Sequence, residues 1–392
     1  MNCAPLKPWS FAAVLALLGC EPPSAPPPVP PIPACAGART CAPDASASTP
    51  DSGAADAGFD AGAIHDAGLD AGRDAGIADA GHGPSLAISA RGGHFETADG
   101  GTVDVRGAIS CCGGGYGWPL FDEAWASLVA ANKGTFLHAR LGPFRTEGNG
   151  ETDWAQPGGG YVEANGKADL AHFNEPFWAR VRALLSYARD RRLYVEVDVI
   201  DGWGIKHCRA GNIPGYSAWE AAFNAQGLDL CATAGSAAIA TGSEHERWVR
   251  KVVAETGRFD NVLYQDGNEA GLIPGYSPEW TRSMQAVIRD EERRRGYGVH
   301  PFGTNSGNTQ AMQLAEVDYL EFHQNNPVAP AQCFGKPCLV NEYNPTPPLT
   351  AAQFRQRFCD ARAEGTTFWY WRHDQTDGQL LDSLAFLGGD CN

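Results

Sequence analysis

From Thr102 to its end, the chain alternates between short runs rich in β-branched and aromatic residues and longer amphipathic stretches. The short runs predict eight strands, at residues 102–110, 135–142, 193–201, 262–269, 299–305, 317–323, 338–343 and 366–372. The stretches between them predict helices, such as those at 121–132, 175–191, 243–256, 278–295 and 350–364. Strict strand–helix alternation is typical of an α/β protein that folds as a (β/α)8 TIM barrel. The fifth and sixth helices are short in this reading, so a doubly wound open sheet stays open as an alternative.

The segment 85–99 precedes the first predicted strand and has the character of a β-hairpin. We expect this hairpin to turn at Asp99-Gly100-Gly101 and to close the bottom of the barrel.

The N-terminus has the layout of a lipoprotein export signal at residues 1–20. Lys7 is followed by an apolar run from Phe11 to Leu18, which is too short to span a bilayer, and then by Gly19-Cys20. Leu17-Leu18-Gly19-Cys20 resembles the bacterial lipobox, which implies that Cys20 is acylated and becomes the new N-terminus. An ordinary signal peptide is the alternative. We therefore expect an exported protein that is lipid-anchored to the bacterial cell envelope, on the outer membrane or cell surface.

Residues 21–84 predict a disordered tether. This segment is rich in proline and then in repeated Asp-Ala-Gly units, so it offers little apolar surface to offset chain entropy. Much of the formal net charge of −16 lies here, and no basic stripe accompanies it. Nucleic acid is therefore not an expected partner, and the only membrane contact that we expect is the N-terminal lipid anchor. We expect a single catalytic domain at 85–392, and a monomer.

Ten cysteines are left after Cys3 and Cys20 are set aside, and several lie close together in sequence. The spacing and the expected export predict the disulfides Cys208–Cys231, Cys333–Cys338 and Cys359–Cys391, with Cys35/Cys41 also close and a vicinal Cys111–Cys112 bridge possible. Paired ligands at zinc-site spacing do not occur, so no metal and no cofactor are expected.

Two glutamates lie at the ends of predicted strands. The fourth strand ends in Asp266-Gly267-Asn268-Glu269 and the seventh in Asn341-Glu342-Tyr343. In a TIM barrel the chemistry lies at the carboxyl ends of the strands. Glycoside cleavage needs one carboxylic acid that protonates the leaving oxygen and one carboxylate at the anomeric carbon. The pair therefore predicts hydrolysis of O-glycosidic bonds.

These motifs resemble clan A of the glycoside hydrolases, within it the cellulase-like family 5 group, over residues 86–390. The resemblance implies that Glu269 is the acid/base, with Asn268 beside it, and that Glu342 is the nucleophile of a retaining enzyme acting on a β-linked poly- or oligosaccharide. We expect the negative charge of Glu342 to raise the pKa of Glu269 and keep it protonated.

The same resemblance implies three further substrate-binding residues. Arg140 matches the strand-2 arginine that pairs with the nucleophile, His323 matches a strand-6 histidine, and Trp371 matches a strand-8 tryptophan beneath the sugar. His323 shares a strand face with Tyr319 and Glu321, so an interior structural role is its alternative. The chain departs from the family in having Asp201-Gly202-Trp203 after strand 3 and His323-Gln324-Asn325 after strand 6.

Long connections follow the first three predicted strands, and their aromatic residues are candidates for sugar subsites. These residues are Tyr116, Trp118, Trp154, Tyr161, Trp203 and Tyr216.

Two other functions compete with the hydrolase. A surface carbohydrate-binding lipoprotein would use the same barrel without catalysis. A metal-dependent barrel hydrolase would need His-x-His on the first strand, which ends instead in Ala108-Ile109-Ser110-Cys111.

Overall fold

The computed structural model describes residues 85–108, 123–143, 159–210, 217–235, 238–323, 329–343, 350–363, 366–370 and 391. The expected signal at 1–20, the lipidation site Cys20 and the tether at 21–84 lie outside the described residues.

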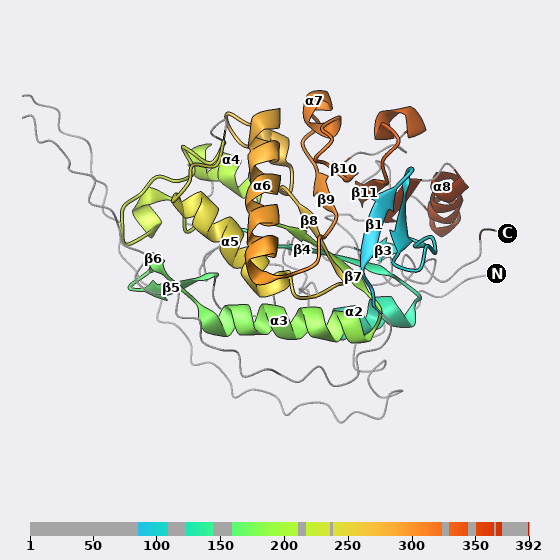
Figure 1. The fold of residues 1–392 in the computed structure, drawn as a ribbon, viewed down its shortest axis with the longest axis horizontal. Coiled ribbons are helices and arrows are strands. Elements are labelled where there is room, and N and C mark those ends of the chain that lie inside the picture. Colours follow the sequence, from blue (N-terminus) through green and yellow to red (C-terminus); the bar gives the residue numbers. More distant parts are fainter. Residues whose placement is uncertain are drawn as a thin grey trace, which may run out of the picture. The chain divides into compact units, whose positions relative to one another are not determined.

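Eight strands form one parallel sheet, in the order β12-β11-β10-β9-β8-β7-β4-β3. They are β3 (Gly107–Ala108), β4 (Phe136–Arg140), β7 (Tyr194–Asp198), β8 (Val262–Gln265), β9 (Phe302–Thr304), β10 (Tyr319–His323), β11 (Cys338–Tyr343) and β12 (Thr366–Tyr370). The two edge strands, β12 and β3, lie next to each other. The expected α/β barrel is confirmed (Figure 1).

Five helices lie on the outer side of the strands: α2 (Glu123–Ala131), α3 (Glu175–Asp190), α5 (Glu244–Thr256), α6 (Pro278–Arg295) and α8 (Ala351–Ala363). After β9 and β10 the chain forms only α7 (Thr309–Met312) and the 3-10 helix η3 (Pro330–Cys333), as the sequence indicated for the fifth and sixth positions. Among the described residues, no helix combines the length and apolar character needed to cross a membrane.

Local sequence signals explain where the long helices begin and end. In α6 the Ser277 side chain accepts a hydrogen bond from the Trp280 amide, and Pro278 occupies the first turn, where its missing N–H is not needed. Gly296 ends the helix at φ 70°, in the left-handed region that favours glycine. The buried face of α6, with Trp280, Met284 and Ile288, packs on the sheet side.

The bottom of the barrel is closed by the hairpin β1 (Ile88–Arg91) and β2 (His94–Thr97). Phe95 is buried under the barrel, and its ring centroid lies 5.9 Å from that of Phe136 and 5.4 Å from that of Tyr319. The expected position of the turn was wrong. The strands reverse at Gly92-Gly93, both at positive φ, because a two-residue hairpin turn requires that geometry. Asp99-Gly100-Gly101 forms the next turn, in which the Thr97 amide donates to the Gly101 carbonyl.

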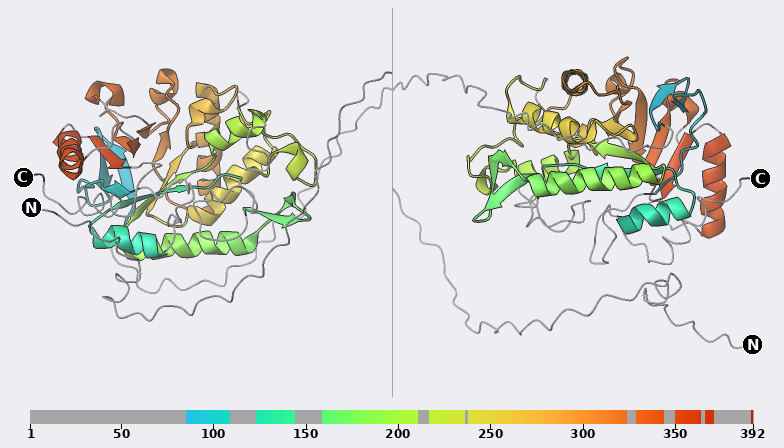
Figure 2. Two further views of the ribbon diagram at one scale, coloured as in Figure 1. Left: turned by 180° about the vertical axis from the view of Figure 1, so that it is seen from behind. Right: turned by 60° about the horizontal axis from the view of Figure 1, so that its bottom comes forward.

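The long connections contain regular structure. The one after β4 forms the hairpin β5 (Tyr161–Ala164) and β6 (Lys167–Phe173), which leads directly into α3 (Figure 2). Tyr161, a candidate for a sugar subsite, is instead a core residue. Its ring stacks on Phe173 and packs against Trp248 of α5, and its hydroxyl donates to Glu244 at 2.6 Å. Ring burial in this aromatic cluster stabilises the outer core and leaves Tyr161 unavailable to a sugar.

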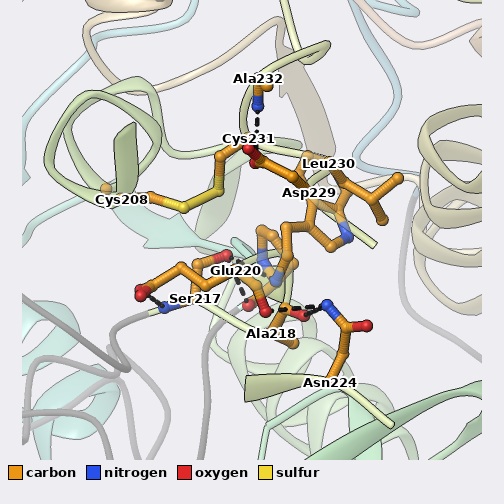
Figure 3. Close-up of a disulfide and its surroundings, with 12 residues drawn as sticks. Cys208, Ser217, Ala218, Glu220, Asn224, Asp229, Leu230, Cys231 and Ala232 are labelled. Atoms are coloured by element: carbon orange, nitrogen blue, oxygen red, sulfur yellow. Dashed lines mark hydrogen bonds between the residues drawn. A yellow bond between two sulfur atoms is a disulfide. The ribbon is translucent and has the colours of Figure 1, made fainter. Parts of the chain in front are cut away.

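The expected disulfides Cys208–Cys231, Cys333–Cys338 and Cys359–Cys391 are all present, with Cα separations of 6.3, 5.8 and 5.4 Å. The last of them ties Cys391 to α8, between β11 and β12, as expected. Cys208–Cys231 joins the helix α4 (Gly202–Ala210) to the segment that follows η1 (Ala221–Phe223) (Figure 3). The Asn224 side chain organises that segment by donating to the carbonyls of Ala218 and Glu220. Cys35, Cys41 and Cys111–Cys112 lie outside the described residues.

Candidate active site

Glu269 lies beyond the carboxyl end of β8, not within the strand. The strand ends at Gln265, and Glu269 begins the 3-10 helix η2 (Ala270–Leu272) in a left-handed conformation, φ 48° and ψ 45°. That conformation is uncommon for a residue with a side chain and persists where its surroundings impose it. Backbone strain of this kind is frequent at functional sites.

Two glycines permit the close backbone contacts that hold this segment. A Cβ at Gly202 would lie 2.4 Å from the Glu269 carbonyl oxygen, and a Cβ at Gly267 would lie 2.7 Å from the Ile200 carbonyl oxygen. Only glycine tolerates approaches this short. The Gly202 amide donates to the Asn268 carbonyl at 2.7 Å. The segments that follow β7 and β8 are therefore joined beyond the carboxyl ends of these strands.

Asn268 is 2% exposed, and its side-chain amide donates to Asp201 at 2.8 Å. The other oxygen of Asp201 accepts the amide of Gly204 at the start of α4. Asn268 therefore fixes the segment that carries Glu269. Its expected contact with substrate stays a prediction.

His323, at the end of β10, lies beside Glu269. Its Nδ1 is 3.4 Å from Oε1 of Glu269, and its Nε2 is 3.6 Å from Oε1 of Glu321 on the same strand. Residues 321 and 323 point to one face because side chains alternate along a strand. His323 therefore fits both of its predicted roles, the interior structural one and the one at the site: it faces the barrel interior and also contacts the candidate acid/base.

The electrostatic environment of Glu269 differs from the expectation. Burial acts to raise its pKa, but the hydrogen bond with His323 and the positive charges of His323, Arg140 and Lys206 outweigh burial and lower the pKa below its usual value. The expected rise of the Glu269 pKa is therefore not found among the described residues. The reason is that cationic groups from three other elements, β4, α4 and β10, gather around this carboxylate.

Arg140 is the last residue of β4 and is buried at the same end of the barrel. Glu342 lies near the end of β11, where its Cα is paired with that of His323 across a register shift. The side chain of Glu342 lies outside the described residues, as does Trp371. The structure thus brings Glu269, His323 and Arg140 together, while the pairing of Arg140 with Glu342 and the role of Trp371 stay predictions.

Of the candidate subsite aromatics, Trp203 is described and follows Gly202, whose backbone packs against that of Glu269. It is partly exposed on the first turn of α4, directly after Gly202, and its ring lies 4.1 Å from the His207 ring, centroid to centroid. Tyr116, Trp118, Trp154 and Tyr216 lie outside the described residues. Lys206, whose charge acts on Glu269, was missed in the sequence because no pattern marks one exposed lysine on a helix.

A second group of polar residues fills the barrel interior below Glu269. His138 of β4, Glu196 and Asp198 of β7, and Glu321 of β10 are all buried. The sequence shows that each of these polar residues lies within a predicted buried strand. It does not show which residues of the other strands they contact. An interior of branched apolar residues is the usual one for this fold.

The comparisons with known proteins show the fold. No protein-family model matches the chain, and no curated protein is similar to it in sequence. Among solved structures, a mutant of the Glycoside Hydrolase Family 5 Mannosidase from Rhizomucor miehei, in complex with mannosyl-fructose, has a TM-score of 0.51 at 11% identity, covering 77% of this chain and 97% of that one. A second mutant of the same mannosidase has a TM-score of 0.50 at 10% identity, covering 77% and 98%.

A protein from Bacteroides vulgatus that is described as a glycoside hydrolase has a TM-score of 0.50 at 13% identity. The alignment covers 75% of this chain but 56% of the Bacteroides protein, so the chain spans just over half of that relative's length. At these identities the similarity shows the fold alone: this chain has an α/β barrel similar to the barrels of these glycoside hydrolases, as the motifs implied.

Proposed function

We propose that this chain is a retaining glycoside hydrolase that cleaves O-glycosidic bonds of a β-linked poly- or oligosaccharide. The observation that carries the proposal is the position of Glu269. It follows the fourth strand of a glycosidase-type barrel, its backbone is held in a strained conformation, and His323 of the sixth strand contacts its carboxylate. Glu342, near the end of the seventh strand, is in register with that histidine.

The proposed reaction has two steps. In the first, Glu269 donates its proton to the glycosidic oxygen while Glu342 attacks the anomeric carbon. The bond to the leaving sugar breaks and a glycosyl ester of Glu342 forms. In the second, Glu269 removes a proton from water, the resulting oxygen attacks the anomeric carbon, and the ester bond breaks to regenerate Glu342 as a carboxylate. No cofactor takes part.

Glu269 must be protonated to act as the acid, although its surroundings lower its pKa. In this proposal Glu269 takes up its proton when the sugar covers the site. Exclusion of water raises a carboxyl pKa, and so does an ionised Glu342 on the other side of the substrate. Arg140 is proposed to keep Glu342 ionised, and Trp371 to stack on the apolar face of the sugar ring. Asn268 and His323 are proposed to bind the sugar beside Glu269, and Trp203 is a further aromatic candidate.

A second candidate function is a surface carbohydrate-binding lipoprotein without catalysis. The low pKa of Glu269 favours it, since an ionised carboxylate accepts hydrogen bonds from sugar hydroxyls but cannot protonate a leaving group. The two functions differ in whether a bound glycan is cut.

Incubation of the purified chain with a panel of β-linked glycans tests the proposal. The panel should include β-mannosides, because two of the similar structures are mannosidases. We expect new reducing ends from at least one glycan, and none from the Glu342→Gln variant, whose amide cannot form the ester. Glu279→Gln, on the exposed side of α6, is the matched control and should keep full activity. A glycan that binds and stays intact would support the second function instead.

We further propose export and lipidation at Cys20, with the protein held on the cell envelope as a monomer by the tether at 21–84. Mass spectrometry of the native N-terminal peptide tests this, and we expect acylated Cys20 as the first residue. A soluble protein with an unmodified N-terminus beyond residue 20 would contradict it.

A further inference from the structure

Three buried polar residues in the barrel interior converge on one point. His138 of β4, Glu196 of β7 and Glu321 of β10 each present one ligating atom, and these atoms all lie within 4.8 Å of one another. His138 and Glu196 are direct partners in the parallel register of β4 and β7, so their side chains leave the sheet on the same side. The three residues lie one layer deeper in the barrel than Arg140 and His323, which follow two positions later on β4 and β10.

The carboxylates of this cluster have too few hydrogen-bond donors. Glu321 is 2% exposed, and neither of its oxygens accepts a hydrogen bond from a described residue. The nearest cationic nitrogen is Nε2 of His323, at 3.6 Å from Oε1. Glu196 is fully buried. Its Oε1 accepts a long hydrogen bond from Gln265 at 3.5 Å, and its Oε2 accepts none from a described residue. Buried carboxylates are otherwise paired, hydrogen-bonded or bound to a metal.

Protonation of these carboxylates does not by itself provide hydrogen-bond partners for their oxygens. A protonated Glu321 would face Nε2 of His323 at 3.6 Å from Oε1, which is too long for a hydrogen bond, and Oε2 of Glu196 would still have no partner among the described residues. A cation between the carboxylates satisfies several of these oxygens at once.

The surroundings of His138 match those of a ligating histidine. Its Nε2 lies 2.7 Å from Oδ2 of the buried Asp198. A carboxylate on one ring nitrogen orients the imidazole and strengthens the other nitrogen as a metal ligand, which is the usual outer contact of metal-bound histidines. Asp198 would orient the ring in this way when the ion is bound.

We propose that His138, Glu196 and Glu321 bind one divalent first-row transition metal ion, of the zinc or manganese type, inside the barrel below Glu269. One imidazole with two carboxylates suits these ions, whereas magnesium and calcium prefer oxygen ligands alone. Bonds of about 2.0–2.2 Å place ligand atoms at most about 4.4 Å apart, so the three groups close on the ion by small side-chain shifts. The site is independent of the proposed glycosidase activity.

No metal was expected from the sequence, because the chain lacks paired ligands at the close spacing of zinc sites. Here the ligands are 58 and 125 residues apart, and three separate strands bring them together.

Metal analysis of the full chain, purified without chelator, tests the proposal. We expect about one equivalent of a transition metal per chain, or, after treatment with EDTA, stoichiometric binding of added Zn²⁺ or Mn²⁺ by calorimetry. Binding should raise the unfolding temperature of the EDTA-treated protein, since an ion that binds only the folded state stabilises it. If the wild type holds no metal and takes up neither ion at stoichiometric levels, the proposal is overturned.

Variants separate this site from surface histidines that bind metal adventitiously. Glu321→Gln keeps the size and removes a charged ligand, so we expect its affinity for Zn²⁺ or Mn²⁺ to fall by at least about tenfold. Asp266→Asn removes a buried carboxylate of the same barrel outside the cluster and should bind metal as the wild type does. Circular dichroism establishes that both are folded; if Glu321→Gln is not, His138→Gln takes its place. Equal affinity in the wild type and the folded ligand variant would overturn the proposal.

Discussion

The Nδ1 nitrogen of His323 lies 3.4 Å from the Oε1 oxygen of Glu269, which joins the end of the sixth strand to the segment after the fourth. The same imidazole lies 3.6 Å from Glu321, so one side chain connects the mouth of the barrel to its buried polar interior. The charge state of Glu269 therefore depends on residues that are distant in the sequence.

Replacing His323 should change the pH dependence of catalysis. Because the hydrogen bond and charge of His323 lower the pKa of Glu269, their loss in His323→Ala raises that pKa. The acid must be protonated to act, so the basic limb of the kcat/KM profile moves to higher pH. His172→Ala, an exposed histidine on β6, should leave the profile unchanged. A limb that stays in place or moves to lower pH would contradict the contact as the cause.

The acid role of Glu269 predicts a dependence on the leaving group. Glu269→Gln cannot donate a proton, so kcat/KM on natural glycans should fall by roughly 10²–10⁴. Aryl glycosides with very good leaving groups need no proton in the first step and should lose far less. The measurement is kcat/KM across a series of aryl leaving groups. Equal losses over the whole series would remove Glu269 from this role.

Net retention of anomeric configuration is expected from the two carboxylates. An eight-stranded barrel is narrow enough that inward carboxylates on its rim approach closely. Retaining enzymes hold them about 5–5.5 Å apart for direct attack, whereas inverting enzymes leave roughly 6.5–9.5 Å for a water. Proton NMR of the first-formed product measures the outcome. If the opposite anomer forms first, Glu342 is not a nucleophile.

Gly202 should be sensitive to a single added methyl group. In Gly202→Ala the new Cβ meets the Glu269 carbonyl oxygen, a backbone atom with little freedom to move. We expect a loss of about 1–3 kcal/mol in the free energy of unfolding, together with reduced activity, because Glu269 is displaced. The matched control is Gly298→Ala, whose Cβ meets no atom within 4 Å, and it should change stability by less than about 0.5 kcal/mol. Urea denaturation of both variants compares them, and similar losses would show that the contact is not the cause.

Asp266 should make the protein less stable as the pH rises. Burial raises its pKa from 3.8 to about 7, against the opposing hydrogen bonds from Thr304 and Thr281. Between these two values the folded state keeps a proton that the unfolded state has released, so the free energy of unfolding falls with pH by up to about 1.4 kcal/mol per unit.

Asp266→Asn removes this titration, and its amide oxygen can still accept from both threonines. Urea denaturation across that pH range should therefore give a flatter profile for this variant than for the wild type. Asp190→Asn, at the exposed end of α3, should keep the slope of the wild type. An unchanged slope in Asp266→Asn would assign the pH dependence to other groups.

The sequence by itself determined the features that depend on local patterns. The alternation of strand and helix predicted the barrel, and the strand-end position of Glu269 predicted the candidate site. Cysteine spacing predicted the three disulfides of the described chain, because short sequence separations leave few alternative partners. The turn at Gly92-Gly93 was missed, since the next glycine pair offers an equally good local signal.

Only the tertiary structure decided which distant side chains meet. The low pKa of Glu269 comes from His323, Arg140 and Lys206, and the interior cluster comes from His138, Glu196 and Glu321. These groups lie on strands and a helix that are separated by tens of residues, and their distances depend on strand register and on the closure of the sheet. The hydrophobic period determines which face a residue occupies. It does not determine the position of that residue along the barrel axis relative to the residues of another strand. That position decides which charged side chains interact.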